Sequence, residues 1–407
     1  MDQMPEGQFR PQRKRRGPYA GKRDAFIASA SREINRKGVK GMTFADVAAP
    51  LAVVPTAVVY YFANKEALAE ACFLNGIGRF REMAAESAEM PEATARIAEL
   101  VRRHLETRAA IRAGDAPEIA AFSDILALGS QVVNDAYVEM FRQTRVLLDG
   151  GSHTSRKELN GRTMLMVGQL TWLPTWLPNW RRKDFARIAE RMSDVLERGL
   201  AAADSSIDEL QLPALDFSVA EPRTPRAQFL TAATVLINQE GYHGMSVERI
   251  SARLNVTKGA FYHHHDSKGD LVEACFERTF GVMWRAIDAA EAAGGSGLQI
   301  VARLLDVLVG LQLSDMPLLR TSALSTVPET LRAQLMMGLR RITIRLASLL
   351  CDGIADGSIR PVDTTITAQM LTAAINGANE LNLWRRDAGS DEARRDYVRA
   401  ILCGFVA

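Results

Sequence analysis

The sequence is poor in the residues that mark several common protein classes. Four cysteines are scattered through 407 residues without a CxxC pair, so neither a disulfide framework nor a cysteine metal site is expected. Apolar stretches are interrupted by proline or charge before the roughly 18 residues that a membrane span needs. The arginine-rich beginning has no apolar leader segment. A soluble cytoplasmic protein with no membrane partner is therefore expected.

Patterns typical of catalysis are also scarce. No Ser/His/Asp, Cys/His or paired-carboxylate arrangement stands out, and no glycine-rich phosphate loop follows a predicted strand. The net charge is only +2, so binding to nucleic acid would depend on local basic patches rather than on the whole chain. Enzymatic activity has no support, and no cofactor is expected.

The chain does contain a long internal repeat. Residues 23–73 align without a gap with residues 226–276, and 18 of the 51 positions are identical. A period near 200 residues is too long for a solenoid and indicates a duplicated domain unit. Similar segments near the ends of the two halves, Trp180-Arg181-Arg182 and Trp384-Arg385-Arg386, extend the duplication beyond the repeat itself.

Each repeat predicts four helices. A first helix is followed by a short second helix, a turn, a short third helix and a long fourth helix. Apolar residues at helical spacing begin near Lys22 and run to Gly38, with Gly241 at the same place in the second copy. Thr43 and Ser246 are expected to cap the second helix.

The third helix and the long fourth helix also have start signals. Pro55 suits the first turn of the third helix, since its fixed φ is already helical. Asn64 and Ser267 are expected to cap the fourth helix, which should end near residues 87 and 292. This order is typical of a helix-turn-helix head on a helical body.

The second copy carries a specific motif. Gly-x-x-Gly-Met-Ser-Val-x-x-Ile-Ser at 241–251, followed by Val-Thr-Lys-Gly-Ala-Phe-Tyr-His-His-x-x-Ser-Lys at 256–268, closely resembles the tetracycline-repressor (TetR/AcrR) family. The resemblance implies dimeric all-α proteins in which a three-helix DNA-binding head joins a ligand-binding, dimer-forming body. The first copy departs from the pattern at Val59, where the family usually has tyrosine.

The fold expected here is all-α, with two TetR-like units forming a pseudo-dimer within one chain. The last two helices of each body are expected to pack together in a four-helix bundle. Further dimerisation of the whole chain stays open. The expected domains are a disordered basic arm (1–21), the first head (22–87), the first body (88–203), a linker (204–224), the second head (225–292) and the second body (293–407).

The residues expected to contact DNA lie mainly on the third helix of each head. In the second copy, two polar and two small residues begin this helix and suit entry into the major groove. The resemblance implies contacts by Thr43, Pro55, Thr56, Ala57, Tyr60 and Tyr61 in the first head and by Ser246, Thr257, Lys258, Gly259, Ala260, Tyr262 and His264 in the second. The first head could instead be retained only for folding.

Lys65 and Lys268 give an argument that is independent of the family. Each stands in the first turn of a predicted helix, where the macrodipole disfavours a cation by roughly 0.3–1 kcal/mol. Their retention in both copies suggests that a DNA phosphate occupies each helix N-terminus. The alternative is a solvated lysine.

Three other features each allow two interpretations. The basic residues of the arm could follow DNA or form a solvated tail. The run His263-His264-His265 resembles a metal site, but adjacent helical side chains point about 100° apart, so no metal is expected. Trp172, Trp176, Trp180 and Trp384 could line an apolar ligand pocket or simply pack in the core.

The function expected from the sequence is a sequence-specific transcriptional regulator that binds a double-stranded DNA operator through two unequal recognition helices. A repressor that responds to an unidentified small-molecule effector is favoured, and it would be nucleoid-associated when bound to DNA. The alternative is a ligand-binding or protein-interaction scaffold that has lost productive DNA binding.

Overall fold

The computed structural model describes residues 18–122, 125, 128–150, 154–203, 215, 217, 224–259, 267–320, 323, 327, 329–385 and 387–405. Regular structure within these residues is helical, apart from one isolated bridge between Ala201 and Ile359. This confirms the all-α prediction. None of the described helices is long and apolar enough to cross a membrane.

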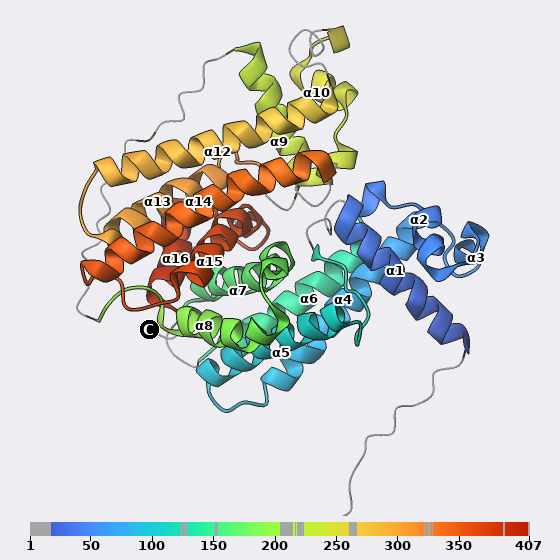
Figure 1. Cartoon of the computed structure of the whole chain (residues 1–407), viewed down its shortest axis with the longest axis horizontal. Coiled ribbons are helices and arrows are strands. Elements are labelled where there is room, and N and C mark those ends of the chain that lie inside the picture. The colour runs from blue at the N-terminus through green and yellow to red at the C-terminus, as the bar shows by residue number, and fades with distance from the viewer. Residues whose placement is uncertain are drawn as a thin grey trace, which may run out of the picture.

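The two halves of the chain repeat the same order of helices (Figure 1). The first unit contains α1 (Pro18–Gly41), α2 (Phe44–Ala48), η1 (Ala49–Leu51), α3 (Pro55–Val59), α4 (Lys65–Ser87), α5 (Ala93–Ala113), α6 (Gln131–Leu148), α7 (Arg156–Trp176), η4 (Leu177–Asn179), η5 (Arg182–Asp184) and α8 (Phe185–Arg198). The second contains α9 (Pro225–Gly244), α10 (Val247–Leu254), α12 (Lys268–Ala292), α13 (Gly297–Leu313), α14 (Glu329–Ala355), α15 (Thr364–Gly377), η7 (Ala378–Leu383) and α16 (Asp391–Cys403).

The predicted helix caps are present in both heads. Asn64 accepts a hydrogen bond from an amide in the first turn of α4, and Ser267 does the same for α12. Both long helices end where the sequence predicts, at Ser87 and Ala292. Helix α1 begins at Pro18, four residues before the predicted start, because proline is tolerated in a first turn. The rest of the predicted arm lies outside the described residues.

The predicted ends of the first helices are kinks. Gly38 has φ 73° and ψ 169° in α1, and Gly241 has φ 72° and ψ 173° in α9. A positive φ is strained for residues with a side chain, which explains glycine at both positions. Each helix then resumes for one more turn to Gly41 or Gly244.

The repeated cysteines pack in the head cores. Cys72 and Cys275 are buried, with their sulfurs 3.5 Å from the carbonyl oxygen of Ile27 and 3.6 Å from that of Leu230, respectively. Burial raises the pKa of the Cys72 thiol to about 12. A thiol in such surroundings is an inert packing group.

The bodies of the two units pack on each other through their last helices. Helix α7 contacts α15 and α16, and α8 also contacts both. Gln169 Nε2 of α7 donates to the carbonyl oxygen of Met370 at 2.9 Å. Arg360 forms a 2.7 Å ion pair with Asp194 of α8. The predicted packing of these four helices within one chain is confirmed.

Two glycines form the closest approach between the units. Gly199 follows α8 with φ 65°, and Gly404 follows α16 with φ 85°. A Cβ on Gly199 would lie 2.3 Å from the carbonyl oxygen of Leu402, and a Cβ on Gly404 would lie 2.3 Å from that of Glu197. Both positions therefore need glycine for backbone conformation and for space.

Candidate nucleic-acid interface and the cavity between the units

The first head presents a short exposed helix with an apolar surface. Pro55 begins α3 after the capping residue Val54, as predicted. Val54 is 65% exposed and Tyr60 is 76% exposed. Val58 is fully buried and anchors the helix to the head core. Exposure of such large apolar side chains indicates a binding surface.

The other predicted residues of this head divide into two groups. Pro55 and Thr56 are exposed, whereas Ala57 is half-buried against the core. Tyr61 is also half-buried, with its ring centroid 5.3 Å from that of Phe26. Tyr61 therefore helps to seat α3 on α1, while the exposed residues form the outer surface.

The capping residues hold the second helices of the heads. Thr43 accepts from the amide of Asp46 in a capping box, and Ser246 accepts from the amide of Arg249. Ala52 and Asn255, 203 positions apart, both have a positive φ of 53° and 55°. The two helix-turn-helix turns thus have the same backbone geometry although their residues differ.

The second head is described as far as Gly259, so Ala260, Tyr262 and His264 lie outside the described residues. Thr257, Lys258 and Gly259 are all exposed. Lys258 Nζ lies 2.6 Å from Oε1 of Glu248 on α10. The hydrogen bond from Lys258 lowers the pKa of the Glu248 carboxyl group to about 2.

The equivalent positions in the first head are Pro55 and Ala45, so this ion pair is specific to the second head. Lys258 must leave Glu248 to reach a base or a phosphate. Both side chains are exposed, so solvent screening keeps this ion pair weak and Lys258 is free to exchange partners.

The repeated lysines reach the last turn of the first helix of their own head. Lys65 Nζ donates to the carbonyl oxygen of Lys40 at 3.0 Å. Lys268 Nζ lies 4.4 Å from the ring centroid of Tyr242, and burial lowers the pKa of Lys268. A structural role, tying the long helix to the first helix, therefore stands beside the predicted phosphate contact.

The two heads also touch each other where α1 and α9 end. A Cβ on Gly41 would lie 2.6 Å from Cδ2 of His243, and one on Gly244 would lie 2.9 Å from Nζ of Lys40. Lys40 also forms a 2.7 Å ion pair with Glu240. The two heads are therefore in direct contact at this point.

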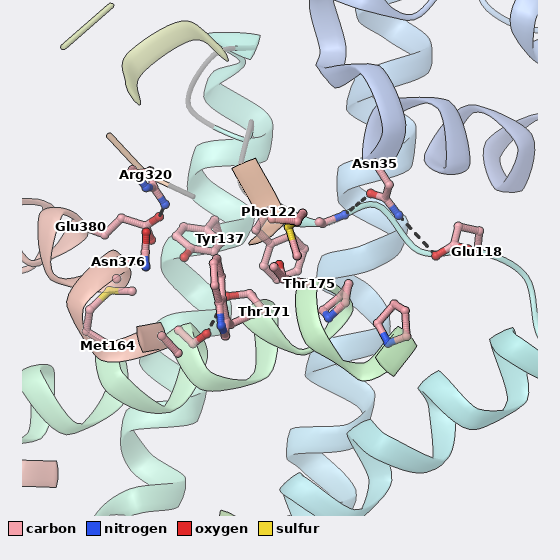
Figure 2. A pocket seen from close by; sticks show the side chains of 18 of the residues that line it. Asn35, Glu118, Phe122, Tyr137, Met164, Thr171, Thr175, Arg320, Asn376 and Glu380 are labelled. Carbon is pink, nitrogen blue, oxygen red and sulfur yellow. Dashed lines mark hydrogen bonds and ion pairs between the residues drawn. The ribbon is translucent and has the colours of Figure 1, made fainter. Parts of the chain in front are cut away.

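A cavity of about 480 Å³ lies between the units. The first unit contributes residues from α1, the 118–122 segment, α6, α7 and the turn that follows it. The second contributes Arg320 and residues from α14, α15 and η7. Arg320 and Glu380 form an ion pair at one end, and Asn35 and Glu118 lie at the other (Figure 2).

An asparagine in each head holds a segment at this cavity. Asn35 Nδ2 donates to the carbonyl oxygen of Ile119 at 2.9 Å, and its Oδ1 accepts from the amide of Ala121 at 2.7 Å. Asn238 Nδ2 donates to the carbonyl oxygen of Leu318 at 2.9 Å, and its Oδ1 accepts from the amide of Arg320 at 2.8 Å. Each head is thereby attached to a cavity-lining residue.

The four tryptophans for which a ligand pocket or core packing was expected lie in different surroundings. Of the four tryptophans, Trp172 lines the cavity. Trp176 and Trp180 pack edge to face at 6.3 Å beyond the proline-containing end of α7, and Trp384 stacks on Phe141 at 3.5 Å. Helix α7 ends at Trp176, so the helical spacing that grouped these residues does not continue to Trp180.

Sequence reasoning missed the residues that connect the cavity to the heads. Asn35 and Asn238 are identical at equivalent positions of the repeat, and this identity was the available signal. Arg320 and Glu380 are 60 residues apart, and neither belongs to a repeated motif. Only the packing of the chain brings them together.

Comparisons with known proteins agree with this architecture. The profile described as "Bacterial regulatory proteins, tetR family" matches residues 26–72 and 229–275, the two heads. The Transposon Tn10 TetC protein of Escherichia coli is 41% identical over 49 residues, which are 12% of this chain and 25% of TetC. The match thus spans a quarter of the length of that relative.

Similar solved structures each cover about half of the chain. A TetR/AcrR family transcriptional regulator from Thermobifida fusca YX-ER1 has 24% identity and a TM-score of 0.32, covering 44% of this chain and 96% of its own. FadR from Bacillus subtilis, in complex with stearoyl-CoA, has 19% identity and a TM-score of 0.36, covering 44% and 97%.

Proposed function

Since the chain belongs to the tetR family of bacterial regulatory proteins and carries two heads of that family, we propose that it is a DNA-binding transcriptional regulator. One chain would supply both heads of a family dimer. One observation carries this proposal. Each unit has an exposed helix-turn-helix segment, and the bodies of the two units pack on each other through their last helices.

The two heads would read different bases. Lys258 can donate to guanine O6 and N7 in the major groove, whereas Pro55 has no donor and suits an apolar contact with a thymine methyl group. Tyr60 is exposed beside this helix and suits a phosphate contact. The operator would therefore consist of two unlike half-sites.

A small-molecule effector would control DNA binding by changing the position of the heads. The hydrogen bonds of the Asn35 and Asn238 side chains attach both heads to segments that line the same cavity. A ligand that binds one arrangement of these segments more tightly than another shifts the population of head positions. Repression relieved by the ligand is the form of regulation we favour.

A protein-interaction scaffold is the second candidate. The exposed Val54, Val59 and Tyr60 would suit an apolar protein partner as well as DNA. Charge discriminates between the two, because DNA binding must weaken steeply with salt whereas apolar docking does not.

The test is selection of genomic DNA fragments by the purified full-length chain, followed by gel shifts at several salt concentrations. The proposal predicts enrichment of a defined sequence and a linear fall of log K with log salt. A matched pair of variants, Thr257→Ala in the recognition segment and Thr365→Ala at an exposed position of the body, separates head effects from general damage. Absence of any enriched sequence would leave the scaffold as the better account.

A further inference from the structure

Both units contribute lining residues to the cavity between them, some of them from equivalent positions. Trp172 and Asn376 each lie eight residues before the equivalent Trp180 and Trp384. Both line the same cavity, from α7 and α15 respectively. Ala121 and Arg320 also line it, and their amides donate to the equivalent asparagines of the two heads. A ligand that contacts equivalent positions of both units in this cavity would bind once per chain.

The two sides of this cavity have become different. The side from the second unit is polar, with the Arg320–Glu380 ion pair and Asn376 (Figure 2). The first unit contributes three aromatic side chains, Phe122, Tyr137 and Trp172, and also Arg32, Asn35 and Glu118 at the far end. The cavity therefore suits a ligand that places a polar group at the Arg320 end and an apolar body against the aromatic side chains.

The buried polar atoms indicate which polar group would fit. Trp172 is 7% exposed, and its Nε1 has no hydrogen-bond partner among the described residues. Arg320 has a side chain 13% exposed, and its Nε likewise lacks a partner there. Both groups can only donate. A buried donor without an acceptor is costly, so a ligand that brings acceptor oxygens is favoured.

Charge selects among such ligands. The cavity is lined by three arginines, Arg32, Arg320 and Arg332, and by two glutamates, Glu118 and Glu380. The excess of arginine favours an anion over a neutral or cationic molecule, and arginine pairs particularly well with carboxylates. The volume falls in the range of small-molecule sites, roughly 300–1,000 Å³.

We propose that this cavity is the effector site and that its ligand is an amphipathic carboxylate bound once per chain. The carboxylate would accept hydrogen bonds at the Arg320 end, and the aromatic or aliphatic body would pack against Phe122 and Tyr137. The Trp172 indole would donate to an oxygen of the same ligand. This assignment rests on the proposed function, in which a small molecule controls the heads.

Isothermal titration of the full chain tests the assignment. The probes are phenyl-substituted and straight-chain carboxylic acids small enough for the cavity, each beside its primary amide and its primary amine. We expect acids to bind with one site per chain and roughly tenfold more tightly than the amides, as for hydrogen bonds to a charged group. Two sites per chain, equal affinity for acids and amines, or no binding of any acid at millimolar concentration would overturn the proposal.

Variants locate the bound acid. Trp172→Phe should weaken acid binding roughly tenfold, because the donor is lost while the ring is kept. Trp176→Phe is the matched control, since Trp176 is equally buried but lies outside the cavity lining, and it should leave binding unchanged. The double variant Arg320→Met, Glu380→Met removes both charges together and should abolish the preference for acids over amides. Retention of that preference would contradict the assignment.

Gel shifts on the same preparations keep this proposal separate from the one on which it rests. Acid binding without sequence-specific DNA binding would overturn the proposed function and keep the ligand class. Sequence-specific DNA binding without a preference for acids would keep the proposed function and overturn the ligand class.

Discussion

Asn35 and Asn238 make the same two hydrogen bonds in the two units, each clasping one segment of the shared cavity through a carbonyl and an amide two residues apart. The geometry is the same although the segments differ in sequence. A movement of either segment must therefore displace the helix of the corresponding head or break the clasp.

Replacing either asparagine should loosen only its own segment. Asn35→Ala should increase hydrogen exchange at the amide of Ala121 and leave the amide of Arg320 protected, and Asn238→Ala should do the opposite. Asn238→Asp keeps the acceptor and should retain protection at Arg320. Each lost hydrogen bond should cost about 0.5–1.5 kcal/mol. Loss of protection at both sites in either single variant would mean that the clasps are not independent.

The contact between the units should be sensitive to a single methyl group. Gly199→Ala places a Cβ against the carbonyl oxygen of Leu402 in a residue with positive φ. We expect the free energy of unfolding, measured with urea, to fall by about 3 kcal/mol or more, because a neighbouring backbone segment must move. Gly114→Ala is the matched control, since Gly114 has φ 80° and no atom within 4 Å of its added Cβ.

The control variant should lose only about 1–2 kcal/mol from the left-handed conformation. An equal fall in the free energy of unfolding in Gly199→Ala and Gly114→Ala would show that the close backbone contact at Gly199 adds nothing to the cost of the substitution.

Salt dependence decides between the two roles of the repeated lysines. If Lys65 and Lys268 contact phosphates, replacing either by methionine should lower the magnitude of the slope of log K against log salt by about one. Methionine keeps most of the unbranched side chain and removes the charge. An unchanged slope together with lower thermal stability would assign both lysines to packing against α1 and α9.

Much of the fold could be predicted because its signals are local and occur twice. Capping residues and the apolar spacing of the heads define long helices whose ends the structure confirms. Gly38 and Gly241 mark kinks one turn before the first helices end. The duplication itself indicated two units, and the last helices of both bodies pack together as predicted.

The cavity could not be predicted because no local pattern specifies it. Its polar end joins Arg320 to Glu380, and its aromatic wall comes from the other half of the chain. The tryptophan spacing was misleading, since α7 ends at Trp176 and the later tryptophan lies outside that helix. The Lys258–Glu248 ion pair likewise depends on the turn geometry between α10 and the segment after it.

Acid should destabilise the protein through a buried histidine. Burial, with a smaller effect of the Arg108 charge, lowers the pKa of His104 to about 3. The unfolded chain binds this proton near pH 6.5 and the folded chain does not. The contribution of neutral His104 to the free energy of unfolding is therefore fully present above about pH 6.5. It decreases as the pH falls toward the pKa of His104 in the folded protein.

The second unit supplies a replacement for this histidine. Leu308 holds the same place in α13, counted from the helix start, and is fully buried. His104→Leu should flatten the fall in urea-unfolding stability between about pH 6.5 and 5. His243→Gln is the comparison variant, and its effect should be smaller because the His243 side chain is exposed. An unaltered pH profile in His104→Leu would contradict the assignment.

The central claim is that one chain presents two different recognition surfaces to one operator. Hydroxyl-radical footprinting on the selected operator, with each half-site scrambled in turn, tests it directly. The account predicts one chain per operator and two unlike half-sites, with the guanine-richer half under the second head. Lys258→Ala should cost about 1–3 kcal/mol and relax specificity in that half alone. A palindromic operator, or an equal loss in both halves, would contradict it.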